Sequence, residues 1–257
     1  MAVTPLNLAI TDITATSVQL NWVRWTPLQI FLAGEKGAWY DPSDLYTLFQ
    51  DAAGTVPVTA DGDPVGLMLD KSGNGYHASQ SVSVSRPLYR TDGTLHWLEF
   101  DGVDDFLVST DIDFTATDKM TQVVGVQSDD SQRIIMEFGF DNLYIFSAAS
   151  FQVEAESRSS YQTSPWTRTN KNIVSVIASV SENVLSVRVN QGAFSTSNSV
   201  QDSGNYKQHA LTIGRRGNGD LPFGGKVYGL VIRGAETTLP DLAKLEQYSA
   251  SLTGVAL

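Results

Sequence analysis

Two segments that lie far apart in the chain combine aromatic and β-branched residues with glycine and aspartate. One is the sequence LEFDGVDDF at positions 98–106, and the other is FGGKVYGLVIR at 223–233. Aromatic and β-branched residues suit a pleated surface, whereas glycine and aspartate suit the tight turns at its edges. Each segment therefore predicts a short antiparallel strand bounded by a turn, and together they predict parts of one β-sandwich.

A run of short apolar segments separated by turn residues fills the middle of the chain. Most of them recur at intervals of about 8–15 residues, a spacing typical of a sandwich or a jelly roll. The predicted strands span residues 122–127, 133–138, 142–147, 151–156, 172–179, 184–189 and 210–213. Because no alternation of strands and helices interrupts them, we expect an all-β jelly-roll β-sandwich.

The C-terminal segment 240–252 is the one convincing helix in the sequence. Leu242, Leu245, Tyr248 and Leu252 fall on one helical face. A glycine at position 254 follows as a stop signal. We therefore expect a short C-terminal helix that closes the fold.

Two shorter elements are predicted before residue 80. Asp41 can cap a short helix over residues 42–49 that begins at Pro42. Residues 65–78 contain an apolar strand, a Ser-Gly-Asn-Gly turn and a second strand.

The first 22 residues alternate apolar and mostly polar positions, a pattern typical of two strands around a turn near 14–16. They resemble the first two strands of a fibronectin type III domain, but the roughly 70 further residues of such a sandwich are missing. We therefore predict a β-strand arm over residues 1–36 and a main domain over 37–257. The exposed edges of the arm would pair with another chain during assembly. Its apolar residues are Leu6, Leu8, Ile10, Val18, Leu20 and Trp22.

Composition excludes several classes of partner and site. The formal net charge of -11 repels phosphate backbones and anionic lipids, so nucleic acid and membranes are not expected as partners. The absence of cysteine excludes disulfides, thiolate nucleophiles and cysteine-bound zinc. The N-terminal sequence lacks the basic start and apolar run of a signal peptide, and no apolar stretch approaches the roughly 20 residues that span a bilayer.

The order of several motifs along the chain resembles that of concanavalin A-like lectin/glucanase domains, specifically the laminin-G-like jelly rolls. The resemblance covers about residues 38–257. The motifs are WYDP at 39–42, DKSGNG at 70–75, FDGVDD at 100–105, IGRR at 213–216 and FGGKVYGLVI at 223–232. The opening GAWYDPSDL also looks like modules of structural proteins in tailed bacteriophages. The resemblance implies a concanavalin A-like jelly roll and a virion origin.

The sequence does not predict a catalytic site. Glucanases of this fold carry a Glu-x-Asp-x-x-Glu strand, because two carboxylates about 5 Å apart act as nucleophile and acid. This motif does not occur, and the nearest candidate is the pair Glu154 and Glu156. Their side chains would share one strand face, with Phe151, Val153 and Ala155 on the other. An exposed strand face explains the pair more simply, so we expect no enzyme.

Three aspartates within five residues are candidate calcium ligands. Asp101, Asp104 and Asp105 supply the hard oxygen atoms that calcium prefers, and Asp70 and Asn74 are candidates to lie nearby. The family that the sequence resembles often binds calcium. Alternatively, these aspartates form turns by bonding the local backbone. No other cofactor is expected.

The best candidate glycan-binding residues are Tyr161, Trp166, Arg168 and Asn170, in a stretch from 157 to 170 that reads as a loop. The same side chains could instead belong to the core or to a subunit contact. The basic loop 214–219 reads as a hairpin turn whose two arginines meet an acidic patch on a neighbour.

These observations predict a non-enzymatic bacteriophage virion structural protein, either a capsid decoration or a tail-associated component. We expect it to be made in the host cytoplasm without a signal peptide. Its partners would be other virion proteins or copies of itself, as in a homo-oligomer such as a trimer. The alternative is a carbohydrate-binding module that recognises host surface glycans, and a glycosidase using Glu154 and Glu156 is a third hypothesis.

Overall fold

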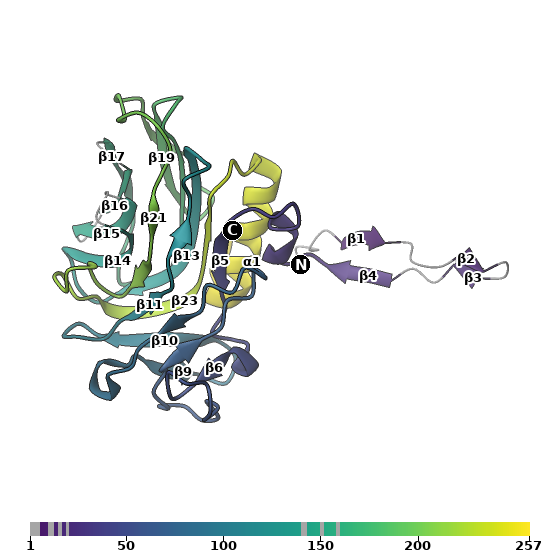
Figure 1. Cartoon of the computed structure of the whole chain (residues 1–257), viewed down its shortest axis with the longest axis vertical. Coiled ribbons are helices and arrows are strands. Elements are labelled where there is room, and N and C mark those ends of the chain that lie inside the picture. Colours follow the sequence, from purple (N-terminus) through teal and green to yellow (C-terminus); the bar gives the residue numbers. More distant parts are fainter. Residues whose placement is uncertain are drawn as a thin grey trace.

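The computed structural model describes residues 6–9, 13–14, 17–18, 21–139, 143–149, 152–157 and 160–257. Within these ranges, side chains are described from Trp25 onward, except those at positions 143, 146, 148 and 149. Two antiparallel sheets form a jelly-roll sandwich, and one helix lies against the outer face of one of them (Figure 1). The all-β fold predicted from the sequence is confirmed. Within the described part of the chain, no helix is long and apolar enough to cross a membrane.

One sheet has nine strands within the described residues. Its order is β17 (Ser160–Pro165), β16 (Gln152–Ser157), β15 (Leu143–Ala149), β14 (Arg133–Phe138), β22 (Leu211–Ile213), β11 (Leu107–Ser109), β8 (Ala78–Ser79), β7 (Leu67–Met68) and β6 (Leu48–Phe49).

The other sheet has eight described strands. Its order is β20 (Ser195–Ser197), β19 (Val184–Val189), β18 (Asn172–Ser179), β13 (Lys119–Ser128), β23 (Gly224–Arg233), β10 (His96–Asp101) and β9 (Leu88–Thr91), with β5 (Gly37–Tyr40) also paired to β23. The short strands β12 (Ile112–Asp113) and β21 (Gln208–His209) form a separate pair.

The two sequence segments that predicted the sandwich lie next to each other in it. β10 and β23 pair antiparallel, with Leu98 opposite Val227. The rings of Phe100 and Phe223 meet edge to face with their centroids 5.9 Å apart in the core between the sheets. Aromatic contacts of this geometry stabilise a core beyond the area they bury. The two segments therefore form adjacent strands of one sheet, and their aromatic residues pack in the core of the predicted sandwich.

Helix α1 (Leu239–Thr253) covers the outer face of the eight-stranded sheet. Thr238 caps its first turn, and Gly254 ends it in a left-handed conformation with φ 72°, which glycine adopts without strain. Leu242 and Leu245 are fully buried in a second apolar cluster together with residues from β13, β18, β23 and β5. The predicted C-terminal helix is confirmed.

A buried ion pair fixes this helix on the sheet. The carboxylate of Glu246 is completely buried and accepts hydrogen bonds from Arg188 Nε and Nη2, both at 2.7 Å. Ser175 on β18 donates a third hydrogen bond at 2.6 Å. Because the guanidinium of Arg188 meets the carboxylate in a bidentate geometry, the charge of Glu246 is fully paired inside the fold.

The loop after β7 ties β5 to the sandwich. The Asp70 carboxylate accepts hydrogen bonds from the backbone N–H groups of Trp39, Ser72 and Tyr76, at 2.8 to 3.0 Å. The Asn74 amide donates to the carbonyls of Glu35 and Gly37. Asp70 is therefore a structural residue, and it does not belong to the group formed by Asp101, Asp104 and Asp105.

The helix predicted over residues 42–49 is wrong. A 3₁₀ helix (Leu45–Thr47) begins after Asp44, and the next two residues form β6. The Asp41 carboxylate accepts hydrogen bonds from Ser43 Oγ at 2.6 Å, from Tyr248 at 2.5 Å and from Lys71 at 3.0 Å. Because Asp41 is occupied by these tertiary contacts, it does not cap a helix.

The predicted middle strands are found, with small shifts at their ends. β14, β18 and β19 begin and end as predicted. One further strand, β17 (Ser160–Pro165), lies in the stretch that was predicted to be a loop, so that prediction is wrong. Its serine, threonine and glutamine residues lack the apolar alternation that marks a strand in the sequence.

The described part of the N-terminal arm is a two-stranded ribbon. β1 (Leu6–Ala9) pairs antiparallel with β4 (Asn21–Arg24), and β2 (Ile13–Thr14) pairs with β3 (Ser17–Val18). Figure 1 draws these strands outside the sandwich. Ile10 and Leu20 lie outside the described residues, as do the side chains of Leu6, Leu8, Val18 and Trp22.

The domain boundary at residue 36 stays a prediction, although the chain joins the sandwich before that point. Trp25, Ile30 and Phe31 are buried in the second apolar cluster beneath α1. Arg233 also forms an ion pair with Glu35 at 2.7 Å. A truncation that spares the sandwich therefore begins at Trp25.

Removal of one partner of the buried ion pair should destabilise the protein strongly. Glu246→Leu and Arg188→Leu should each lower the free energy of unfolding by about 3 to 5 kcal/mol, because each leaves a buried charge without its partner. The double variant should lose much less free energy of unfolding than the sum of the losses in the two single variants. Urea denaturation of the wild type, the two single variants and the double variant gives these free energies. If the two single losses add up to the loss in the double variant within about 0.5 kcal/mol, the pairing is contradicted.

Candidate functional site

The outer face of the nine-stranded sheet is the face that α1 does not cover. Strands β14 to β17 lie on the side of the sandwich away from the helix (Figure 1). On β16, Val153 and Ala155 are fully buried in the core, whereas Glu154 and Glu156 are half-buried on the outer side. The predicted division of this strand into a core face and a glutamate face is thus confirmed for the described residues.

Four neighbouring strands place glutamate and tyrosine side chains side by side on this face. The register sets Glu137 on β14 opposite Tyr144 on β15, Tyr144 opposite Glu156 on β16, and Glu156 opposite Tyr161 on β17. Residues that face each other on adjacent strands share one side of a sheet. We call Glu137, Tyr144, Glu154, Glu156 and Tyr161 the acidic row.

The Tyr144 hydroxyl joins two carboxylates of the acidic row. It donates to Glu156 in a short hydrogen bond and lies 3.4 Å from Glu154 Oε1. Burial raises the pKa of both glutamates above the ordinary value, although the hydrogen bond from Tyr144 opposes the shift. Burial, followed by the bond to Glu156, also raises the pKa of Tyr144. The tyrosine thus stays a hydrogen-bond donor at neutral pH.

An arginine pairs with the other end of the row. Glu137 is only 3% exposed, and it accepts a hydrogen bond from the Gly217 amide at 2.6 Å. Arg216 Nε lies 3.3 Å from the Glu137 carboxylate, and its guanidinium lies 5.6 Å from the centroid of the Tyr144 ring. Burial raises the pKa of Glu137, while the Gly217 amide and Arg216 oppose the shift.

The basic loop 214–219 therefore meets an acidic patch within its own chain. Arg216 contacts Glu137, and the guanidinium of Arg215 lies 3.4 Å from the centroid of the Phe106 ring. These contacts lie within the chain, and a contact of the two arginines with a neighbouring molecule stays a prediction. The loop holds a cation beside the acidic row.

The four residues predicted to bind a glycan are divided between two places. Tyr161 is 68% exposed on the same face as the acidic row. Trp166 is only 5% exposed and belongs to the core between the sheets. A core position was the alternative predicted for this residue. Arg168 donates to the carbonyl of Asp129, and Asn170 is exposed. The glycan-binding role of this group stays a prediction.

Trp166 and Asn170 do line a common cavity. It has a volume of about 470 Å³ and lies where the chain passes from β17 to β18. We call it the Trp166 cavity. Its lining residues are Pro165, Trp166, Thr167, Asn170, Lys171, Asn172, Val189 and Asn190.

The three predicted calcium ligands lie together. One carboxylate oxygen from each of Asp101, Asp104 and Asp105 falls within 4.8 Å of the others. Their carboxylates also form the turn: Asp101 Oδ1 accepts from the Val103 amide at 2.8 Å, and Asp104 Oδ2 accepts from Ser85 at 2.6 Å. Both predicted roles fit this geometry, so calcium binding stays a prediction.

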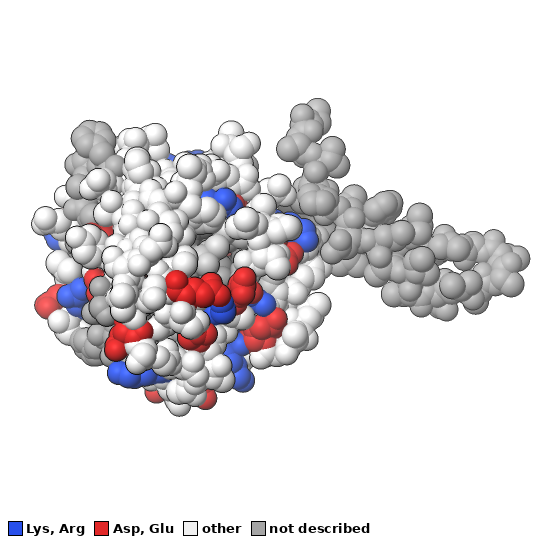
Figure 2. Space-filling view, turned by 90° about the horizontal axis from the view of Figure 1, so that it is seen from above, with Lys and Arg blue, Asp and Glu red and all other residues white. Residues whose placement is uncertain are grey.

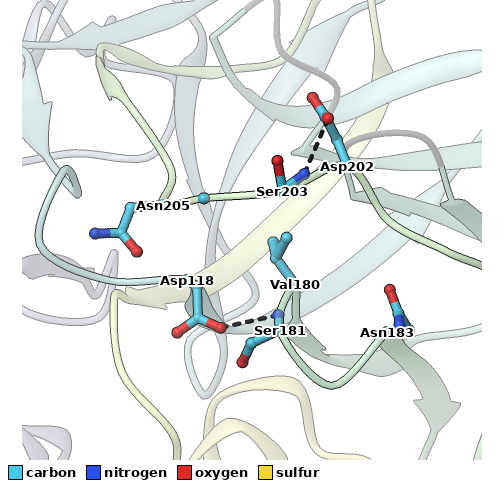
Figure 3. Close-up of a pocket in the computed structure, with 8 residues that line it drawn as sticks. Asp118, Val180, Ser181, Asn183, Asp202, Ser203 and Asn205 are labelled. Atoms are coloured by element: carbon cyan, nitrogen blue, oxygen red, sulfur yellow. Dashed lines mark hydrogen bonds between the residues drawn. The ribbon is translucent and has the colours of Figure 1, made fainter.

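A second cavity, of about 540 Å³, lies at the other end of β18. Figure 3 shows Asp118, Asn183, Asp202 and Asn205 around it. Asp118 Oδ2 accepts a hydrogen bond from the Ser181 amide at 3.0 Å. The Ser181 side chain, followed by this amide, keeps the pKa of Asp118 below its ordinary value, although burial opposes the shift. The residues that line it include no aromatic side chain and no cation.

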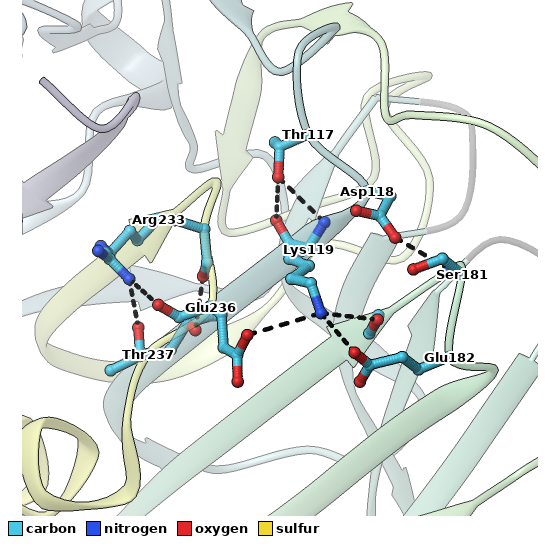
Figure 4. A network of polar contacts seen from close by, with 11 residues as sticks. Thr117, Asp118, Lys119, Ser181, Glu182, Arg233, Glu236 and Thr237 are labelled. Atoms are coloured by element: carbon cyan, nitrogen blue, oxygen red, sulfur yellow. Dashed lines mark hydrogen bonds and ion pairs between the residues drawn. The ribbon is translucent and has the colours of Figure 1, made fainter.

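A polar network beside this second cavity is structural. Lys119 lies 2.8 Å from Glu182 and 3.6 Å from Glu236, and Arg233 donates to Thr237 at 3.0 Å (Figure 4). The hydrogen bond from Lys119 to Glu182 raises the pKa of the lysine.

On the face seen in Figure 2, acidic and basic side chains are interspersed, and the basic side chains do not form one continuous patch.

Sequence reasoning missed two members of the acidic row, Glu137 and Tyr144. Their proximity depends on the pairing of β14 with β15. The signal that was available is the single glutamate among the apolar residues of segment 134–138. A charged residue there is rarely buried without a partner.

Comparison of the sequence with models of known families and with curated proteins finds no match. Solved structures do resemble this chain. An arabinofuranosidase complexed with arabinofuranosyl-α-1,2-xylobiose has a TM-score of 0.61 and 13% identity, over 89% of this chain and 65% of that one. Botulinum neurotoxin type C, described as entering cells through interaction with two ganglioside molecules, has a TM-score of 0.55 and 11% identity, over 86% of this chain and 53% of that one.

A Trypanosoma rangeli sialidase in complex with the inhibitor DANA has a TM-score of 0.51 and 14% identity, over 76% of this chain and 31% of that one. The chain spans about half the length of the botulinum neurotoxin binding domains that it resembles, 48% in the type DC structure. At such low identities the likeness shows the fold alone. It confirms the all-β jelly-roll sandwich.

The environment of Asp105 predicts a pH-dependent stability. Burial, together with Asp101 and Asp104, raises the pKa of Asp105 to about 6. Since the folded state holds this proton more tightly than the unfolded state, stability should fall by about 1 to 3 kcal/mol as the pH rises from about 4 to about 7. Urea denaturation in EDTA should show a smaller fall for Asp105→Asn. The exposed control Asp111→Asn should behave like the wild type, and equal falls in all three proteins would contradict the prediction.

Proposed function

We propose that this chain is a carbohydrate-binding module and that a glycan binds across the acidic row. The observation that carries the proposal is a row of carboxylate and phenol groups across four strands, with the guanidinium of Arg216 beside it, on the sheet face that α1 leaves open. Such a face offers a glycan many hydrogen-bonding groups at fixed positions.

The chemistry of the row suits sugar hydroxyl groups. Carboxylates accept hydrogen bonds, the guanidinium of Arg216 donates them, and phenol groups do both. The ring of Tyr161, which is 68% exposed, adds an apolar surface next to these groups. A pyranose has both polar edges and apolar faces, so it can use both kinds of contact.

Binding, rather than hydrolysis, is the better account of Glu154 and Glu156. Both carboxylates contact the same Tyr144 hydroxyl, so they lie on one side of any ligand. A glycosidase instead needs two carboxyl groups that flank the scissile bond. The solved structures that resemble this chain include an arabinofuranosidase complexed with arabinofuranosyl-α-1,2-xylobiose and a botulinum neurotoxin described as interacting with two ganglioside molecules, which supports the class of ligand by fold analogy.

Two substitutions test the row. Tyr161→Ala and Glu156→Gln should each weaken binding to the best glycan from an array by about tenfold, or ~1.4 kcal/mol. Each removes one direct contact and leaves the core face of its strand unchanged. Isothermal titration calorimetry gives the affinities.

Tyr46→Ala is the matched control. Tyr46 is 92% exposed and adjoins β6, at the opposite edge of the same sheet. The control should bind like the wild type. An array without any hit, or equal affinities for all variants, contradicts the proposed function.

We also propose that the protein is a virion component of a tailed bacteriophage, with residues 1–24 as an assembly arm and host surface glycans as ligands. The support is the opening GAWYDPSDL at 37–45, which looks like modules of tailed-bacteriophage structural proteins, and the ribbon of β1 and β4, which has pairing partners only within itself among the described strands. An unpaired strand edge is a template for another chain. A homo-oligomer, such as a trimer, follows from an arm that pairs with copies of itself.

Deletion of residues 1–24 tests the arm. The full-length chain should be an oligomer in light scattering, and the truncated chain should be a monomer. Its melting temperature should stay close to that of the full chain, because the truncation keeps Trp25 and the cluster beneath α1. Equal molar masses for both proteins contradict an assembly role.

A further inference from the structure

We propose that the loop 214–219 sets the specificity of the acidic row, with Arg216 as the residue that contacts the glycan and Glu137 as the residue that positions Arg216. This inference rests on the proposed function, because it assigns roles within the same site. Glu137 is only 3% exposed, so its carboxylate lies beneath the surface on which a glycan can rest. Its role in recognition is therefore indirect.

The loop 214–219 connects β22 to β23 and begins at a fixed point in the core. Gly214 has φ 96°, in the left-handed region that favours glycine, and a Cβ atom there would lie 2.5 Å from the ring of Phe100. The Gly214 amide donates to the Ile135 carbonyl at 2.9 Å, and the Gly214 carbonyl accepts from the Phe223 amide at 2.7 Å. The first residue of the loop therefore cannot shift without displacing core residues.

Glu137 holds the middle of the loop through both of its carboxylate oxygens. The Gly217 amide donates to Oε2 at 2.6 Å, and Nε of Arg216 lies 3.3 Å from Oε1. The register of β14 places Glu137 opposite Thr212 on β22, the strand that leads into the loop. Because a buried carboxylate without partners is costly, these two contacts stabilise Glu137. The same contacts fix the position of Arg216.

Arg216 keeps its terminal amino groups available for a ligand. Its side chain is 33% exposed, and its guanidinium lies 5.6 Å from the centroid of the Tyr144 ring, so it is beside the acidic row. Within the described part of the chain, Nη1 and Nη2 of Arg216 donate no hydrogen bond. A guanidinium carries five N–H donors in one plane and no acceptor, so these two groups can donate to two oxygen atoms of a sugar at the same time.

Arg215 offers a matched comparison within the same loop. Its guanidinium lies 3.4 Å from the centroid of the Phe106 ring, and the charged group that acts on it is Asp104. The two consecutive arginines therefore have different surroundings, and Arg216 is the one that lies at the row. Substitution of either arginine removes the same charge from the loop.

Calorimetry of the full-length protein with the strongest hit of a glycan array tests the contact. Arg216→Gln should weaken binding at least tenfold. Arg216→Lys should also weaken it, by at least fivefold, because an ammonium keeps the charge but lacks the planar pair of donors. The control Arg215→Gln should bind like the wild type.

A double-mutant cycle tests the positioning role. Glu137→Gln should weaken binding at least fivefold in the wild-type background and less than twofold in the Arg216→Gln background, because Glu137 acts through Arg216. A purely structural role of Glu137 would give the same loss in both backgrounds. The Arg216 variants change a partly exposed side chain, so they test the contact even if Glu137→Gln lowers the melting temperature.

The outcomes separate this inference from the proposed function. Binding that depends on Tyr161 but is unchanged in Arg216→Gln, or is weakened equally by Arg215→Gln, overturns the inference and leaves the proposed function in place. Equal losses from Glu137→Gln in the two backgrounds overturn the positioning role. An array without any hit contradicts both the inference and the proposed function.

Discussion

The buried ion pair between Glu246 and Arg188 decides which surface of this sandwich is available to a partner. A carboxylate without solvent is stable only if its partner meets it with good geometry, and here the arginine and Ser175 saturate it. The pair therefore fixes the position of α1 on the eight-stranded sheet. With that outer face covered, the outer face of the nine-stranded sheet is the broad surface left for recognition.

The open face and the Trp166 cavity have opposite electrostatic character. On the outer face of the nine-stranded sheet, the carboxylates of Glu137, Glu154 and Glu156 lie beside one tyrosine and one arginine. Burial raises the pKa of all three carboxylates. In the cavity, amides and Lys171 line a space without a carboxylate among the described residues. The fold is the scaffold for both surfaces, and their side chains give each surface its electrostatic character.

The sequence was sufficient for the fold because the relevant signals are local. Phe100 and Phe223 sit in segments whose composition already marks them as strands, and Gly254 marks the end of α1. The site was harder to predict, since Glu137, Tyr144 and Glu156 are brought together by strand register. Strand β17 was missed because its polar residues resemble a loop, although it carries Tyr161. For Trp166 the sequence left glycan binding and the core as alternatives, and its burial places it in the core.

The most direct test of glycan binding across the acidic row is a map of where a bound glycan lies. Backbone amide shifts of the ¹⁵N-labelled protein, recorded during titration with the best glycan from an array, provide it. If a glycan binds across the acidic row, the largest shift changes should occur in β15, β16 and β17, around Tyr144, Glu156 and Tyr161, and the shifts of α1 should change little. Changes confined to the 101–105 turn or to the second cavity around Asp118 would contradict it.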